Sequence, residues 1–272
     1  MQDRGLGNPA LDALGESLPR QTTPLTPAPK GEEPVTDRLT AHPLAGLPKA
    51  EETEPTRKRR ALTDEEISRL LEAAELRPLR EALLVRRGKN KGKPLANVRP
   101  EVRRRLERLG RQRALLYRFM LLTGLRKGEV TSLPVRALDL DGDPPSVHVE
   151  GRHAKSGRSA VLPLRPDLAE ALRHHLAGRN GSPLAFDVPS DWKRVFDADL
   201  AAAGIPKRDA HGRTVDVHAL RHTFATLLAR NGISPTVAQK LMRHSDIRLT
   251  MNVYTHLELA DTAGAVAGLP RL

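Results

Sequence analysis

One tyrosine near the C-terminal end of this chain has the surroundings of a potential nucleophile. Only two tyrosines occur, and Tyr117 lies within the apolar run LLYRFMLL, where we expect a role in the core. Tyr254 instead lies in HSDIRLTMNVYTH, with polar neighbours on both sides. A free phenol has a pKa of about 10, so neighbouring groups must activate it before it attacks a phosphate. Tyr254 is therefore the candidate nucleophile, and basic partners must be found for it.

Two arginines occur where they can bind a phosphate. Attack on a phosphodiester builds negative charge on its non-bridging oxygens, and planar guanidinium donors pair with two oxygens at once. Arg126 follows Gly124 at the end of an apolar run, and Glu129 is close enough in sequence to orient it. Arg221 follows His218 by three residues, which puts both side chains on one face of a helix. These pairs predict an anion-binding site.

Two further residues can move protons. Lys155 lies at the tip of a predicted hairpin, where it can protonate a departing 5′ oxygen if nearby cations depress its pKa. The alternative is a lysine that is simply solvated in a turn. His244 precedes Tyr254 by ten residues and can hydrogen-bond the same phosphate or carry a proton.

Four segments carrying these residues resemble the catalytic boxes of the tyrosine recombinases, the phage integrase family. They are TGLRKGEV, AKSGRSAVLPL, HALRHTFAT and LMRHSDIRLTMNVYTH, and the resemblance covers about residues 61–258. It implies the fold of the catalytic domain of these DNA breaking and rejoining enzymes. It also implies six catalytic residues in family order: Arg126, Lys155, His218, Arg221, His244 and Tyr254.

The resemblance assigns a role to each of these residues. Arg126 and Arg221 would clamp the scissile phosphate, and His244 would bind it as well. Lys155 would be the general acid, and His218 would assist proton transfer. The tyrosine would form a 3′-phosphotyrosyl bond that conserves the phosphodiester energy, so neither ATP nor a metal cofactor would be needed.

Further expectations about partners follow from the same resemblance. The chain would be a site-specific recombinase or integrase that acts as a homotetramer on two double-stranded DNA duplexes. It would have no small-molecule substrate, would not enter a membrane, and would be cytoplasmic and associated with DNA. The segment 259–272 would be a tail that docks on a neighbouring subunit.

The sequence departs from the family pattern in three places. Arg243 stands where the family usually has glycine before the histidine. The basic stretch 86–113 looks longer than the usual connection and is interpreted as an insertion that grips DNA. Residues 1–60 do not look like the family's helical core-binding domain, although HPLAGLPK resembles its interdomain linker, so that domain is expected to be missing from this chain.

Rival interpretations rest on weaker patterns. His218 and His222 have the spacing of two zinc ligands, but Ala219 occupies the position where such a motif has glutamate. A calcium loop starting at Asp139 would need glycine at its sixth position, where Pro144 stands. A phosphate loop in GKNKGKP is one residue too short. The remaining rival is a non-catalytic DNA-binding module, in which the helix after Ser234 forms part of a helix-turn-helix.

The elements that would position these residues are mostly helical. Thr63 and Glu66 form a capping-box signal, and basic and apolar helical stretches follow as far as Gly124. Alternation near 147–149 and 160–164 predicts a β-hairpin. Helices are expected from Pro166 to about 176, over 190–203, over 217–230, and after Ser234. The predicted fold is mainly α with a small antiparallel β-sheet (α+β), over residues 61–258.

Composition sets limits on the partner and on the organisation of the chain. Lys and Arg number 45 against 33 Asp and Glu, a net charge of +12 that suits a polyanion such as DNA. The absence of cysteine excludes disulfides, thiolate catalysis and Cys-ligated zinc. No continuous apolar run is long enough to span a bilayer. Nine of the 22 prolines fall within residues 1–60, which are interpreted as a disordered tail and linker ending in a solvated stretch, 51–60.

Overall fold

The computed structural model describes residues 58–151, 159–177 and 183–255 of the chain. Their main helices are α1 (Asp64–Leu83), α2 (Pro100–Thr123), α3 (Lys127–Thr131), α4 (Pro166–Ala177), α5 (Trp192–Ala202), α6 (Val217–Arg230), α7 (Pro235–Met242) and α8 (Arg248–Tyr254). Three short strands accompany them: β1 (Leu138–Asp139), β2 (Ser146–Val149) and β3 (Ala160–Pro163). The predicted fold class, mainly helical with one small sheet, is confirmed. No helix in the described ranges is long and apolar enough to cross a membrane.

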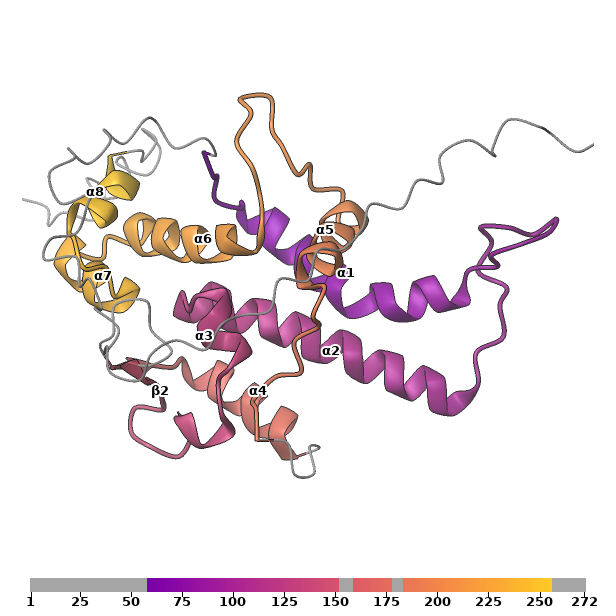
Figure 1. The fold of residues 1–272 in the computed structure, drawn as a ribbon, viewed down its shortest axis with the longest axis horizontal. Helices are drawn as coiled ribbons and strands as arrows, with labels where there is room; N and C mark the ends of the chain where they lie inside the picture. Colours follow the sequence, from indigo (N-terminus) through magenta and orange to yellow (C-terminus); the bar gives the residue numbers. More distant parts are fainter. Residues whose placement is uncertain (1–57, 152–158, 178–182, 256–272) are drawn as a thin grey trace, which may run out of the picture. The chain divides into compact units, whose positions relative to one another are not determined.

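Helices α1 and α2 run side by side as an antiparallel pair (Figure 1). The predicted capping box starts α1, because the Thr63 hydroxyl accepts from the Glu66 amide and the Glu66 carboxylate accepts from the Thr63 amide. The basic and apolar stretches predicted as successive helical pieces form one continuous helix, α2. It ends at Gly124, whose φ of 60° lies in the left-handed region that favours glycine.

The two helices come into close contact at Gly110. A Cβ atom at this position would lie 1.8 Å from the carbonyl oxygen of Glu75, so only glycine permits the contact. Beyond it, the connecting loop 84–99 is tied by backbone hydrogen bonds. The amide of Val85 donates to the carbonyl of Lys93 (2.9 Å), and the amide of Ala96 donates to the carbonyl of Leu83 (2.9 Å). The two sides of this loop are thus hydrogen-bonded to one another.

The sheet has the strand order β1-β2-β3, with both pairs antiparallel. Strand β2 pairs with β3 in the register Val147 to Leu162, which confirms the predicted hairpin strands. The tip of this hairpin lies outside the described residues. Strand β1 was not predicted, because two residues are too few to show alternation.

A buried polar group connects α1, α2 and α5 within the core. Asp199 has no exposed surface and accepts hydrogen bonds from Tyr117 (2.7 Å), Arg77 (2.6 Å) and Arg113 (3.2 Å). The predicted core role of Tyr117 is therefore confirmed. Burial, together with the charge and hydrogen bond of Asp199, raises the pKa of this phenol far above its usual value. Tyr117 is a structural hydrogen-bond donor.

The C-terminal helices α6, α7 and α8 pack against one another (Figure 1). Helix α6 has the predicted bounds, and Ser234 caps α7 as expected, accepting from the Val237 amide. Helix α8 was not predicted, because its seven residues contain only one fully buried side chain, Thr250, and so carry no helical apolar period. It carries Tyr254 as its last residue.

Residues 58–60 belong to the folded domain, contrary to their assignment to a solvated linker. Arg59 pairs with Asp216 through two hydrogen bonds of 3.0 Å. Arg60 donates to both carboxylate oxygens of Glu66, at 2.6 and 2.7 Å, and its side chain is only 11% exposed. The charge of these residues suggested solvation, but bidentate pairing with carboxylates allows Arg59 and Arg60 to lie partly or largely out of the solvent.

Candidate active site

Arg221 is the most deeply buried arginine of the predicted site. It lies in the second turn of α6, and the residue is 3% exposed. Its two terminal nitrogens donate to the carbonyl oxygens of Gly124 and Met242, at the ends of α2 and α7. Carbonyls at helix C-termini lack helical partners and carry partial negative charge, so they suit a guanidinium. Burial lowers the pKa of Arg221 to about 9, and the charges of Arg126 and Arg243 act in the same direction.

Arg126 and Glu129 form the second part of the cluster, as their spacing predicted. Arg126 precedes α3, and its amide donates to Glu129 Oε2 (2.7 Å) while its Nη1 donates to Oε1 (3.1 Å). The Glu129 side chain is 1% exposed, whereas that of Arg126 is 23% exposed. A buried carboxylate therefore holds the arginine from two directions and leaves part of its guanidinium open to a ligand.

Arg243 places a third guanidinium on the same carboxylate. Its Nη2 donates to Glu129 Oε2 at 2.9 Å, and its side chain is 7% exposed. Its backbone has a φ of 53°, in the left-handed region, as the residue after α7. Glycine adopts this conformation more readily than residues with a side chain do. The sequence showed Arg243 as a departure, but not its contact with a residue 114 positions away.

His244 is fixed beside this cluster by three hydrogen bonds. Its ring Nδ1 lies 2.9 Å from the Thr250 hydroxyl, its amide donates to the Gln239 carbonyl, and its carbonyl accepts from the Gln239 side chain. Burial, followed by the charges of Arg221 and Arg126, lowers the pKa of His244 to about 4. The imidazole is therefore neutral at pH 7, which suits a hydrogen-bonding role.

His218 occupies the first turn of α6, on the same face as Arg221. Although the residue keeps surface open to solvent, desolvation is the main cause that lowers its pKa, followed by the charges of Arg59 and Arg221. Asp216, the N-cap of α6, opposes this shift while it pairs with Arg59. The influence of Arg59 was missed, because it lies within the stretch interpreted as linker.

Arg126, Arg221, Arg243 and Glu129 are called the cationic cluster below. Tyr254 makes its hydrogen bond outside this cluster. Its hydroxyl donates to the carbonyl of Ile233, in the connection between α6 and α7. Partial burial alone raises the pKa of this phenol, with no lowering from any arginine. The hydroxyl is thus a protonated donor to a backbone carbonyl, and it must leave that contact before it can act as a nucleophile.

The structure brings together four of the six predicted site residues. Arg126, Arg221, His218 and His244 influence one another's charge and converge from the ends of α2, α6 and α7. Lys155 lies outside the described residues. In the described ranges, no three His, Cys, Asp or Glu side chains gather as a metal site, so His218 and His222 find no third ligand there.

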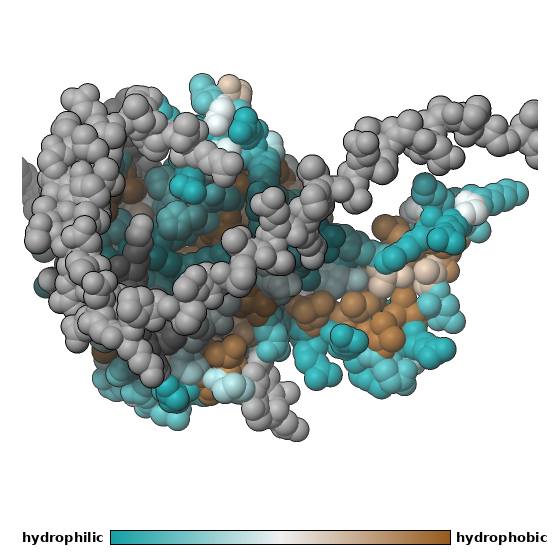
Figure 2. Space-filling view, viewed as in Figure 1, coloured by the Kyte–Doolittle hydropathy of each residue, from teal (hydrophilic) through white to brown (hydrophobic). Residues whose placement is uncertain are grey.

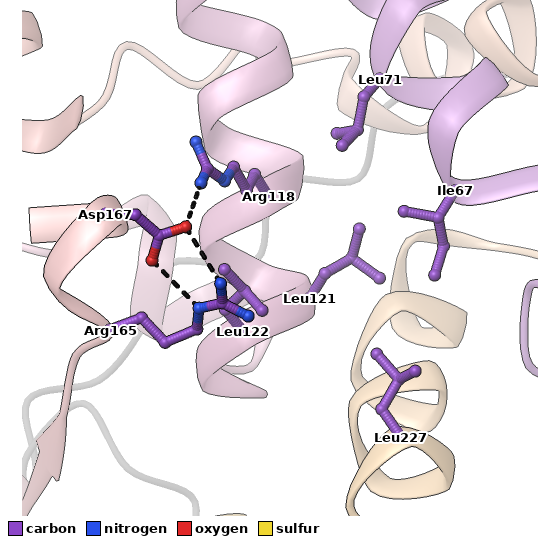
Figure 3. Close-up of a pocket in the computed structure, with 8 residues that line it drawn as sticks. All are labelled: Ile67, Leu71, Arg118, Leu121, Leu122, Arg165, Asp167 and Leu227. Carbon is purple, nitrogen blue, oxygen red and sulfur yellow. Dashed lines mark hydrogen bonds and ion pairs between the residues drawn. The ribbon is translucent and has the colours of Figure 1, made fainter. Parts of the chain in front are cut away.

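One hollow among the described residues lies away from this cluster. It measures about 190 Å³ and lies among α1, α2 and α6, with apolar walls that include Ile67, Leu121 and Leu227. Figure 3 shows Asp167 between Arg118 and Arg165 at one side, at 2.6 and 3.0 Å. None of the predicted site residues lines it. The cationic cluster is therefore the stronger candidate for chemistry on a phosphate.

Comparisons with known proteins identify this domain. The sequence pattern described as "Phage integrase family" matches residues 101–260. Tyrosine recombinase XerA of Saccharolobus solfataricus is 33% identical over 148 residues, which are 54% of this chain and 46% of that protein. Tyrosine recombinase XerC of Erythrobacter litoralis is 34% identical over 141 residues, 51% of this chain and 44% of the other. The chain spans about half the length of these relatives.

Solved structures share the fold at low sequence identity. XerH site-specific recombinase bound to a palindromic difH substrate superposes with a TM-score of 0.53 and 19% identity, covering 78% of this chain and 54% of that one. XerA recombinase gives a TM-score of 0.50 at 22% identity, covering 79% and 67%. Because the family pattern matches more than half of the sequence, the chain belongs to the phage integrase family, whose members include the tyrosine recombinases.

Proposed function

We propose that this chain is the catalytic part of a site-specific DNA recombinase that cleaves and rejoins strands through Tyr254. One observation carries the proposal: guanidinium groups from separate segments converge on one buried carboxylate. Arg126 and Arg243 both donate to Glu129, and the neighbouring Arg221 is fixed by the carbonyls of Gly124 and Met242, so all three are held before any ligand arrives. Fixed donors need no reorganisation when negative charge develops on a phosphate, which makes them effective in catalysis.

The proposed reaction exchanges one phosphoester for another. The Tyr254 oxygen attacks the scissile phosphorus and passes its proton to the neutral imidazole of His218, and the bond from phosphorus to the 5′ oxygen breaks. Lys155 donates a proton to the departing 5′ oxygen. The arginines and the neutral His244 hold the non-bridging oxygens. Rejoining reverses these steps, so the number of phosphoester bonds is conserved, and the proposal includes no ATP, no metal and no small-molecule substrate.

Tyr254 must change partner for this reaction to occur. Its hydroxyl donates to the Ile233 carbonyl, and its raised pKa keeps it protonated. Helix α8 is short, with seven residues and one fully buried side chain, Thr250. A helix with so little buried surface can shift at modest cost. DNA binding is therefore proposed to move the tyrosine into the cluster.

A covalent adduct tests this function directly. The protein is incubated with a nicked duplex that traps the cleaved strand, then denatured and examined for DNA-linked protein. The wild type should form the adduct without metal and in the presence of a chelator, and Tyr254→Phe should form none. Tyr117→Phe is the matched control, because that phenol only donates to Asp199, so its adduct yield should follow the folded fraction. An adduct formed by Tyr254→Phe would disprove the assignment.

Assembly on DNA is a further part of the proposal. One solved relative is described as bound to its difH substrate, and another as a lambda integrase dimer bound to a core site. We expect this chain to form a homotetramer on two duplexes, next to the DNA in the cytoplasm, with segment 259–272 docking on a neighbour. Light scattering with and without DNA should show a lower mass for a chain that ends before residue 257. An unchanged mass would remove that docking role.

A binding module without chemistry is the alternative function. It would bind the same duplexes and form no adduct with any variant. The buried guanidinium cluster argues against it, because non-specific DNA contacts need only exposed cations.

A further inference from the structure

Residues 84–111 form the end of the α1 and α2 pair that lies away from Gly124, and they carry a high density of positive charge. This segment, called the basic arm below, consists of the loop 84–99 and the first half of α2. It contains eleven Lys and Arg against only two acidic residues, Glu101 and Glu107. Its teal side chains, with brown apolar ones between them, cover the far end of the α1 and α2 pair in Figure 2.

Most of these cations have no carboxylate partner. Arg103 lies 4.0 Å from Glu107, and Arg104 lies 3.7 Å from Glu101. In the part of the chain that the structure describes, the other nine cations of the arm make no ion pair, and all nine are exposed: Arg86, Arg87, Lys89, Lys91, Lys93, Arg99, Arg105, Arg108 and Arg111. A group of like charges repels itself, so a polyanion that neutralises it binds favourably.

The arm is built to present these charges rigidly. At Gly110 the backbones of α1 and α2 are in close contact, with no side chain between them. Backbone hydrogen bonds join the two sides of the loop. At the base, Asp199 is shared between Arg77 of α1 and Arg113 of α2. A rigid surface loses less conformational entropy on binding than a disordered basic tail does.

Helix α2 also fixes the distance between the arm and the cationic cluster. It ends at Gly124, whose carbonyl accepts from Arg221. At about 1.5 Å per residue, Arg111 lies roughly 20 Å and Arg105 roughly 28 Å from Gly124 along the helix. One turn of DNA is about 34–36 Å and 10–10.5 base pairs long, so this separation corresponds to about six to eight base pairs.

We propose that the basic arm is a second DNA-binding surface, which grips backbone phosphates at least about six base pairs from the scissile phosphate. This inference rests on the proposed function for its substrate, but it assigns a separate contact outside the reaction site. Backbone phosphate is the proposed partner, because clustered exposed cations neutralise the DNA backbone whatever its sequence.

A triple variant on two duplex lengths tests the arm. Arg105, Arg108 and Arg111 lie three residues apart, and replacing all three by alanine keeps a strong helix former at each position. On a duplex with about 20 base pairs on each side of the cleavage site, affinity at about 0.1 M salt should fall roughly ten- to several-hundredfold, and the salt slope should fall by two to three. On a duplex with five base pairs on each side, the variant and the wild type should bind equally.

A matched control separates position from net charge. Arg173, Lys193 and Arg208 are exposed cations outside the arm, and their triple alanine variant removes the same charge. It should bind the long duplex at least tenfold more tightly than the arm variant. Equal losses in both variants, or an arm variant that binds the long duplex like the wild type, would overturn the proposal. The adduct assay on nicked DNA tests the chemistry separately, so a protein that binds but never forms an adduct fails only the proposed function.

Arg243 supports a second, independent inference. Its Nη2 donates to Glu129 Oε2, the same oxygen that accepts from the Arg126 amide. Its Nε and Nη1 are buried and have no hydrogen-bond acceptor among the residues that the structure describes. Without Arg243, one carboxylate would face Arg126 and Arg221 with a single net positive charge. With Arg243 present, the cluster has two net positive charges, and two guanidinium groups share Glu129.

We further infer that Arg243 is a positioning residue, which fixes Glu129 and so leaves more of the Arg126 charge for the phosphate. The inference rests on the proposed function, because the anion it invokes is the scissile DNA phosphate. The contacts of Arg243 in the structure do not depend on that function. Arg243→Gly removes the guanidinium and suits the observed φ of 53°, so the fold should be kept. Arg243→Lys keeps the charge but not the forked donor.

Two measurements test the role of Arg243. On nicked DNA at saturation, Arg243→Gly should form the adduct at least about tenfold more slowly than the wild type, with Arg243→Lys between them. In a Glu129→Gln background, the same change should have less than a threefold effect. Titration by NMR should show the pKa of His244 rising from about 4, because a nearby cation has been removed. Either a wild-type rate or an unchanged His244 titration would overturn the inference. The titration needs no activity, so it remains decisive if no adduct forms.

Discussion

The cationic cluster and the basic arm both depend on arginine side chains, which are largely buried and paired in the cluster but exposed in the arm. In the cluster, Arg221 and Arg243 are buried, and they bind helix carbonyls and the Glu129 carboxylate. In the arm, nine cations are exposed and have no ion-pair partner within the described residues. A buried charge must be paired to offset its desolvation, whereas an exposed charge remains solvated. The arrangement of partners therefore separates a preorganised site from a surface that collects phosphates.

The largest loss of folding stability should follow from removing the carboxylate of the cluster. Glu129→Ala leaves Arg126 and Arg243 without their shared acceptor, and breaking a buried ion pair typically costs about 3–5 kcal/mol of folding free energy. Urea unfolding should show this loss. Glu101→Ala in the arm is the control, because its exposed pair with Arg104 should contribute at most about 1 kcal/mol. Equal losses would show that burial does not distinguish the two regions.

The pH dependence of stability should reveal the cluster next. The folded-state pKa of His244 is about 4, below the ordinary value of about 6.5, so the unfolded chain binds the proton more readily. Its contribution is complete above pH 6.5 and is lost as the pH falls towards 4. We expect a loss on the order of 2 kcal/mol between pH 7 and pH 4.5, to which His218 adds in the same direction. Urea unfolding of His244→Gln should show a weaker pH dependence; an equal one would remove this cause.

Packing in the arm should give a comparable or smaller effect. Gly110→Ala would force the helices apart, because its Cβ would lie 1.8 Å from the Glu75 carbonyl oxygen. Overpacking of this kind costs about 1–3 kcal/mol. Gly128→Ala is the control, since a Cβ there meets nothing within 4 Å, and it should leave the melting temperature unchanged or slightly higher. Similar melting temperatures for the two variants would contradict a rigidly packed arm.

The smallest effect should come from the exposed charges of the arm. Arg105→Ala removes a cation without an ion pair and should change the folding free energy by less than about 0.5 kcal/mol. Thermal melting at low and at high salt should both agree with the wild type within error. A clear loss of stability would indicate a structural role and weaken the assignment of this charge to DNA.

Local patterns predicted much of the fold. The capping box of Thr63 and Glu66, the glycine at the end of α2 and the serine cap of α7 each act within a few residues, so the sequence shows them directly. Helix α8 and strand β1 were missed because they are too short to show a period. Arg59 and Arg60 were interpreted as solvated because their acid partners appear only in the folded domain.

The sequence by itself determined the order and types of the candidate site residues, and with them membership of the family. It also determined the pairing of Arg126 with Glu129, which are three residues apart. Only the tertiary structure decided that Arg243 reaches Glu129 and that the Tyr254 hydroxyl contacts Ile233. These contacts join segments that are distant along the chain or meet at helix ends, and sequence spacing carries no information about such meetings. Burial, which sets the charge state of His244, likewise exists only after the helices have packed.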